Sequence, residues 1–176
     1  MKPVLMIHEF KEEFLDLPLE NYTLTFDDGL YTQYRFIGEL KKIKTNKFFF
    51  ISSNIICPET VNQDNSFISC IDAHINSLKG DYTNYMKWSQ IREIDSYDQC
   101  NIGCHSHLHS LKTADCVECI ILDNRYMFNT FNKELNYIPK DFCFPYNYET
   151  SLYRQILEKK GFINFFGKER IDINEI

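Results

Sequence analysis

The sequence lacks the features of several large protein classes. Basic residues are not in excess, because 19 Lys and Arg stand against 25 Asp and Glu, which gives a net charge of −6. This balance argues against a surface that follows nucleic-acid phosphates. No stretch approaches the ~20 apolar residues that a membrane-spanning helix needs. We therefore expect no nucleic-acid partner and no membrane span; the oligomeric state is left open.

The beginning of the chain, MKPVLMIHE, also lacks the apolar core of a signal peptide, since only residues 3–7 separate Lys2 from His8. The seven cysteines are odd in number and do not show the spacing of a small secreted disulfide domain. These two observations predict reduced thiols and a cytoplasmic protein.

Repeats, low-complexity tracts and flexible linkers are absent from the sequence as well. The chain has 176 residues, of which 44% are hydrophobic and 15% aromatic. That is enough for one well-buried core and too little for two ordinary domains. We predict a single globular domain over residues 1–176.

Short apolar runs, mostly without alternation, are typical of buried parallel strands. They occur at residues 4–7, 23–26, 48–51, 101–104, 142–144 and 163–166. Helical patterns lie between them, at residues 31–42, 88–94, within 114–135 and at 151–160. This order predicts an α/β fold with a mainly parallel sheet, either open or curled into a barrel. Residues 57–85 show the least pattern and are expected to form a long excursion over the surface or the site.

Two adjacent carboxylates follow the second predicted strand, in the stretch TLTFDDG. Asp27 and Asp28 precede Gly29, which allows a tight turn. One aspartate could simply cap the following helix. Two in series are costly to desolvate without a cation or a shared proton, so the pair favours a metal ligand beside a proton acceptor.

Three of the five histidines lie within the stretch NIGCHSHLHS. His105, His107 and His109 directly follow a predicted strand, and such a cluster favours a metal over isolated structural histidines. If the segment is helical, His105 and His109 share a face and can bind one ion, while His107 points elsewhere. With one aspartate, this set leaves a position for water, as in catalytic zinc sites.

The motifs TLTFDDG and HSHLH resemble the first two motifs of the polysaccharide deacetylases, the NodB-homology domain or carbohydrate esterase family four. Further stretches resemble other parts of that family in the same order. They are PVLMIHEF (3–10), NKFFFISSNI (46–55), YMKWSQIREI (85–94), FCFPYN (142–147) and ILEKKGF (156–162). The resemblance covers most of the chain and implies a distorted or incomplete (β/α) barrel.

The resemblance also implies an activity, the metal-dependent hydrolysis of the acetamide of an N-acetylated sugar, with release of acetate. The implied ligands of a divalent metal, expected to be zinc, are Asp28, His105 and His109. Asp27 would then be the catalytic base. Pro145 and Tyr146 would contact substrate.

The backbone N–H of Tyr146 would also help to stabilise the oxyanion. Ser106 would steady the histidine loop through a hydrogen bond.

Three positions depart from the family pattern. Cys143 stands where the family carries an arginine that orients the catalytic aspartate, and Asn147 replaces a glycine. No histidine follows His109, although the family uses a late histidine as general acid. His8, at the end of the first predicted strand, is the first substitute for that acid. His74 and His107 are the other candidates.

Three other interpretations remain open. Cys100, Cys104, Cys116 and Cys119 could hold a structural zinc in an interaction module. The pair His105-x-His107 could belong to a metallohydrolase that acts on another ester or amide. The missing late histidine also allows a sugar-binding pseudoenzyme that keeps the metal.

Overall fold

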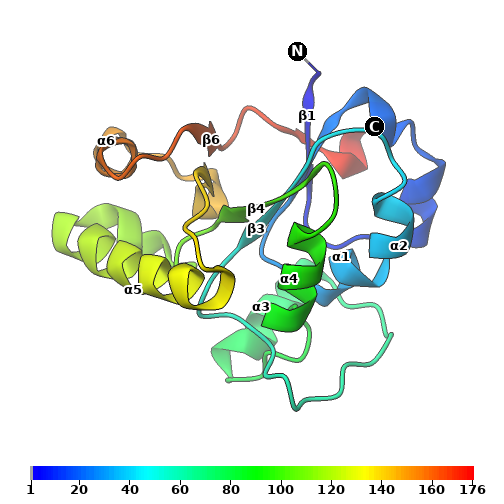
Figure 1. The fold of residues 1–176 in the computed structure, drawn as a ribbon, viewed down its shortest axis with the longest axis horizontal. Coiled ribbons are helices and arrows are strands. Elements are labelled where there is room, and N and C mark those ends of the chain that lie inside the picture. Colours follow the sequence, from blue (N-terminus) through cyan, green and yellow to red (C-terminus); the bar gives the residue numbers. More distant parts are fainter. Residues whose placement is uncertain (1) are drawn as a thin grey trace.

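The structure is a computed structural model that describes residues 2–176 and contains one seven-stranded sheet (Figure 1). The strand order is β6-β5-β4-β3-β2-β1-β7, and all neighbouring strands are parallel. The strands are β1 (Val4–Ile7), β2 (Thr23–Phe26), β3 (Lys47–Ile51), β4 (Cys100–Cys104), β5 (Asp141–Cys143), β6 (Asn164–Phe166) and β7 (Ile171–Asp172). Since β6 and β7 are the two edges, the sheet is an incomplete (β/α) barrel, which confirms the predicted fold class.

Helices surround the sheet. The α-helices are α1 (Tyr31–Arg35), α2 (Ile37–Leu40), α3 (Cys70–Leu78), α4 (Trp88–Asp95), α5 (Val117–Leu135) and α6 (Ser151–Lys159). Short 3₁₀ helices are η1 (Glu12–Asp16), η2 (Leu19–Asn21), η3 (Leu111–Asp115), η4 (Pro145–Asn147) and η5 (Ile173–Glu175). Figure 1 shows α5 and α6 toward the β5–β6 end of the sheet and α1 and α2 toward the opposite end. No helix within residues 2–176 is both long and apolar enough to cross a membrane.

The six predicted strands are all present, with ends that differ by one residue at most. The helix predicted over residues 31–42 is instead two short helices that meet at Phe36. Two elements were not predicted, α3 and β7. The larger apolar side chains of α3, such as Ile71 and Leu78, are exposed, and its buried residues are Ala73 and Ser77. Its sequence therefore lacks the usual buried apolar stripe.

The central strands β2, β3 and β4 are largely buried on both faces, as parallel strands usually are. Phe26 of β2 and Phe49 of β3 are fully buried, and their rings stack with centroids 4.5 Å apart. Gly103 of β4 lies against the ring of Phe50, where a Cβ atom would approach to 2.4 Å. A larger residue at position 103 would therefore displace β3. The register brings the carboxyl ends of β1, β2, β4 and β5 to one edge of the sheet.

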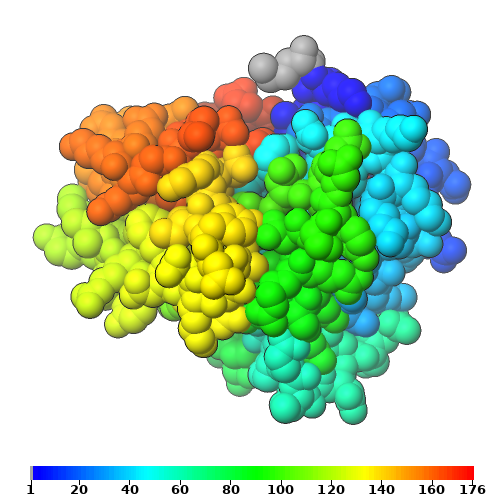
Figure 2. Space-filling view, viewed as in Figure 1, coloured from blue at the N-terminus to red at the C-terminus, as the bar shows by residue number. Residues whose placement is uncertain are grey.

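The end of the chain returns to its beginning. β7 pairs with β1, aligning Ile171 with Leu5. Figure 2 shows the red C-terminal residues beside the blue N-terminal residues on the face in view. As a result, residues near position 170 lie next to the ends of β1 and β2.

The expectation of reduced cysteines is wrong at one pair. Cys116, the N-cap residue of α5, forms a disulfide with Cys119 in the first turn of that helix. The other five cysteines are free. Because a helix places residues three positions apart on neighbouring sites, this pair needs no long-range framework to meet.

Candidate metal centre and active site

Asp27, Asp28 and Gly29 form a turn directly after β2 that places two carboxylates at the carboxyl end of this strand. Asp28 and Gly29 both adopt the left-handed conformation, with φ of 69° and 73°. A Cβ atom on Gly29 would lie 3.1 Å from Cδ1 of Ile51, so the position favours glycine in both conformation and space. Asp27 and Asp28 are 2% and 8% exposed. The turn therefore buries two adjacent acidic side chains at the carboxyl edge of the sheet.

The histidine segment after β4 is a loop, so His105 and His109 do not share the face of a helix. The chain turns through positive φ at Ser106 and His109, with values of 63° and 49°. The Ser106 hydroxyl accepts a hydrogen bond from the backbone N–H of His109 at 2.9 Å. Asp123 of α5 accepts hydrogen bonds from the backbone N–H groups of His107 and Leu108 at 2.8 and 3.0 Å. These contacts hold the loop in place of a helix.

The loop nevertheless brings His105 and His109 together with Asp28. Oδ1 of Asp28 lies 3.1 Å from Nε2 of His105 and 3.0 Å from Nε2 of His109. The three residues form a group in which one potential ligand atom from each lies within 4.8 Å of the others. The predicted metal ligands therefore converge on one point.

The hydrogen bonding of this group fits a cation. Nδ1 of His105 lies 2.8 Å from the carbonyl oxygen of Cys143, which can only accept, so this nitrogen carries the proton. In the neutral ring, Nε2 then directs a lone pair toward the Asp28 carboxylate. Among the described residues, Oδ1 of Asp28 and Nδ1 of His109 are buried without a hydrogen-bond partner. Convergent acceptor atoms of this kind are the donor set that a divalent metal such as zinc binds.

Electrostatics also keeps Asp28 ionised. Burial alone would raise the pKa of its carboxyl group, but positive charge on the imidazoles of His109 and His105 in the metal-free site outweighs burial and holds the pKa well below its usual range. A bound cation would supply the same positive charge next to neutral rings. A carboxylate in this state can bind a cation without first losing a proton.

Asp27 has a different partner, Arg170, which the sequence did not predict. The guanidinium forms two parallel hydrogen bonds to the carboxylate, from Nη1 to Oδ1 and from Nη2 to Oδ2, both 2.7 Å long. Arg170 also donates to the hydroxyl of Thr25 at 3.0 Å and to Oδ1 of Asn147 at 2.7 Å. It is 9% exposed. This bidentate contact fixes the plane of the Asp27 carboxylate.

Arg170 replaces the arginine that the resemblance places at position 143. Cys143 is buried, and its thiol lies 3.5 Å from Oδ2 of Asp27. Burial raises the pKa of Asp27, but the Arg170 charge and its hydrogen bonds more than offset this and leave the pKa below its usual value. No local motif marks Arg170, because its role depends on the pairing of β7 with β1. The missing arginine at position 143 was the only sequence signal that another cation is needed.

A cavity of about 220 Å³ opens above these residues. Besides the aspartates and the two converging histidines, it is lined by His8, Cys70, Ile71, His74, Ile75 and Tyr146. Helix α3 supplies four of these side chains, so the excursion predicted over residues 57–85 lies over the site. The cavity therefore combines buried charged groups at its base with apolar groups from α3.

The predicted acid candidates have different positions. His8 follows β1 and lines the cavity. His74 of α3 also lines it, and its Nε2 lies 3.3 Å from the hydroxyl of Tyr146. Burial and nearby His109 lower the pKa of His74. His107 is turned away, with Nδ1 2.8 Å from the Ser53 hydroxyl and its ring stacked on Tyr126.

Tyr146 lies at the mouth of the cavity in η4. It has a positive φ of 57°, directly after Pro145, and its side chain is 48% exposed. Its ring centroid lies 4.7 Å from that of His109. Asn147, which replaces the family's glycine, also adopts a positive φ of 55°. The tight turn is therefore kept, and the Tyr146 ring is available to a ligand.

Two of the alternative interpretations do not fit this geometry. Cys100 and Cys104 are buried in β4, whereas Cys116 and Cys119 are bonded to each other at the start of α5. Within residues 2–176 these four cysteines do not form a metal-ligand group. His107 likewise joins no such group among the described residues, so the pair that converges is His105 with His109.

No known family profile and no curated protein sequence matches the chain. Solved structures do. IcaB from Ammonifex degensii has a TM-score of 0.68 at 20% identity, over 98% of this chain and 85% of that one. A de-N-acetylase from Aggregatibacter actinomycetemcomitans gives 0.66 at 12% identity, over 97% and 93%. The deacetylase PplD from Streptococcus pyogenes, in complex with acetate, gives 0.64 at 14% identity, over 92% and 80%. The chain therefore has the fold of NodB-type deacetylases.

Proposed function

We propose that this protein is a metal-dependent hydrolase that removes the acetyl group of an N-acetylated sugar and releases acetate. The observation that carries the proposal is the convergence of Asp28, His105 and His109 beside a second, separately held carboxylate, Asp27. The fold shared with de-N-acetylases supports it. A nitrogen and oxygen donor set of this composition suits zinc.

The two aspartates have separate tasks in this proposal. A zinc ion held by Asp28, His105 and His109 would act as a Lewis acid, lowering the pKa of water and polarising the acetyl carbonyl. Asp27 accepts the proton of the attacking water. Arg170 holds both oxygens of Asp27, so the carboxylate stays ionised and correctly oriented.

The loop after β5 contacts the substrate. Tyr146 has a left-handed backbone conformation in η4, so its N–H is not part of a regular helix. This N–H donates to the oxygen of the acetyl group as negative charge develops there. Pro145 fixes the turn, and the exposed Tyr146 ring packs against the sugar.

The leaving amine needs a proton, and two histidines in the cavity could supply it. His8 approaches from the end of β1, and His74 approaches from α3 beside Tyr146. Either histidine would replace the late histidine that the sequence lacks. We propose one of these two as the general acid.

The proposal is tested by measuring acetate release from a panel of N-acetylated sugars, together with the metal content of the same sample. We expect acetate release that a chelator abolishes and zinc restores. A protein that binds zinc but releases no acetate from any substrate would be the sugar-binding pseudoenzyme. A protein that releases acetate equally well after chelation would contradict the assignment of Asp28, His105 and His109.

A further inference from the structure

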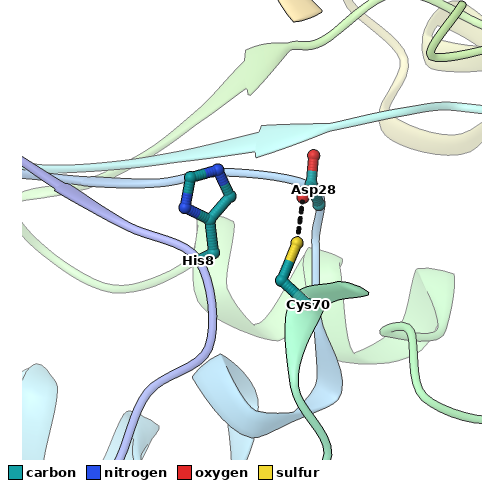
Figure 3. A group of neighbouring side chains, drawn as sticks. All are labelled: His8, Asp28 and Cys70. Atoms are coloured by element: carbon teal, nitrogen blue, oxygen red, sulfur yellow. Dashed lines mark hydrogen bonds between the residues drawn. The ribbon is translucent and has the colours of Figure 1, made fainter. Parts of the chain in front are cut away.

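Asp28 belongs to two groups of potential metal ligands. Its Oδ1 faces His105 and His109, as described above. Its Oδ2 accepts a hydrogen bond from the thiol of Cys70 at 3.0 Å. His8, Asp28 and Cys70 form a separate group whose ligand atoms lie within 4.8 Å of one another (Figure 3). Oδ1 of Asp28 therefore faces the two imidazoles of the first group, whereas Oδ2 faces the Cys70 thiol of the second.

We propose that His8, Asp28 and Cys70 bind a second divalent cation, so that Asp28 bridges two metal ions. The inference rests on the proposed function in one respect: the second ion would share Asp28 with the first. Imidazole, carboxylate and thiolate are the three ligand types of zinc in proteins. Paired metals about 3.5–4 Å apart, often bridged by a carboxylate, are a known arrangement in hydrolases.

Burial supports the site. Asp28 is 8% exposed, whereas His8 and Cys70 are partly buried and line the same cavity. A second cation would therefore reach the three ligand atoms from solvent through the cavity that also admits the substrate. Figure 3 shows the His8 ring and the Cys70 thiol on chain segments that approach Asp28 separately.

The start of α3 places Cys70 at the second site. Cys70 is the first residue of α3, directly after the N-cap Ser69. Burial and the neighbouring Asp28 carboxylate raise the pKa of the Cys70 thiol, so a bound cation has to displace its proton. The Cys70 backbone N–H donates to Oε2 of Glu9 at 3.2 Å, which ties the start of α3 to the segment after β1. This contact holds Cys70 near His8.

Cys70 does not belong to the first group. Within residues 2–176, no group joins the Cys70 thiol to His105 or His109 within 4.8 Å. Cys70 could become a fourth ligand of the first ion only if α3 moved. As a ligand of the second ion, it needs no such movement. If His8 is a metal ligand, His74 is the group that remains to protonate the leaving amine.

The test is a titration of the metal-free protein with cobalt(II), followed by absorption spectroscopy. The protein carries Cys116→Ser and Cys119→Ser, so that this exposed pair cannot bind cobalt if it is reduced. We expect two equivalents of cobalt, with a thiolate-to-cobalt charge-transfer band. Cys70→Ser should bind one equivalent without the band. Cys100→Ala, a change at a free cysteine in β4, should keep both equivalents and the band.

Variants of the other ligands distinguish the two sites in the same titration. His8→Ala should lose the same equivalent as Cys70→Ser, whereas His105→Ala should lose the other equivalent and keep the band. One equivalent in the parent protein, unchanged in Cys70→Ser, would overturn the proposal. Acetate release that depends on metal, measured on the parent, would then still support the deacetylase. Two equivalents without acetate release would support the second site and contradict the deacetylase.

Discussion

Arg170 binds both carboxylate oxygens of Asp27 at 2.7 Å, although the two residues lie at opposite ends of the sequence. The guanidinium lies beside Asp27 and near Cys143, the position at which the family resemblance implies an arginine. Asp27 therefore has a cationic partner although position 143 is a cysteine. The pairing of β7 with β1 makes this possible.

Replacing Arg170 with lysine should lower turnover by about 10- to 100-fold with little change in zinc content. Lysine keeps the positive charge but cannot bind both oxygens of Asp27 in one plane. Acetate release and elemental analysis check this on the same sample. Arg154→Lys, which changes an exposed arginine paired with Glu149 and Glu158, is the matched control. Equal activities of the two variants would show that the bidentate contact is unnecessary.

An arginine placed at position 143 should restore part of the stability and activity that Arg170→Ala removes. Arg170→Ala leaves the buried Asp27 carboxylate unpaired, so the free energy of unfolding should fall by about 3–5 kcal/mol. Adding Cys143→Arg places a guanidinium next to Asp27, because the Cys143 thiol already lies 3.5 Å from its Oδ2. Denaturant unfolding and acetate release of the single and double variants check this. If the double variant is less stable and less active than Arg170→Ala, an arginine at position 143 cannot take the place of Arg170 beside Asp27.

His74→Ala should lower turnover on N-acetyl sugars by about 100-fold or more without loss of metal. The reason is that an amine leaves poorly unless it is protonated. Hydrolysis of an acetyl ester with a good leaving group, such as a nitrophenol, should be affected much less. His107→Gln, at a ring stacked on Tyr126, is the control. Equal losses on both substrates would show that His74 does not act as the acid.

Ser106→Ala should weaken zinc binding by about 10- to 100-fold. The Ser106 hydroxyl accepts the backbone N–H of His109 and fixes the left-handed turn that brings the ring to Asp28. Competition with a chromogenic chelator measures the affinity. Ser110→Ala, in the same loop but without a side-chain capping bond, should bind zinc as the parent does. Unchanged affinity in Ser106→Ala would mean that the loop is held mainly by Asp123.

The sequence was sufficient for the parallel sheet, because short buried strands alternate with helices and need no distant information. It also indicated Asp28, His105 and His109, since residues after strands of a parallel sheet meet at one edge. Helical spacing is not what joins the two histidines, because a loop with two left-handed residues brings their rings together.

Other features could not be predicted, because they depend on contacts between distant segments. Helix α3 exposes Ile71 and Leu78 and so lacks the usual amphipathic pattern. Arg170 reaches Asp27 only after β7 has paired with β1. The disulfide between Cys116 and Cys119 depends on the exact start of α5. The cytoplasmic location and the single domain stay predictions.

The most direct test of the account compares Asp27→Asn with Asp28→Ala for zinc content and acetate release. These adjacent residues have similar burial, but they are held by different partners, Arg170 for Asp27 and the two histidines for Asp28. We predict that Asp27→Asn keeps its zinc and loses nearly all acetate release, whereas Asp28→Ala loses the zinc itself. Zinc retained in full by Asp28→Ala, or undiminished acetate release by Asp27→Asn, would contradict the account.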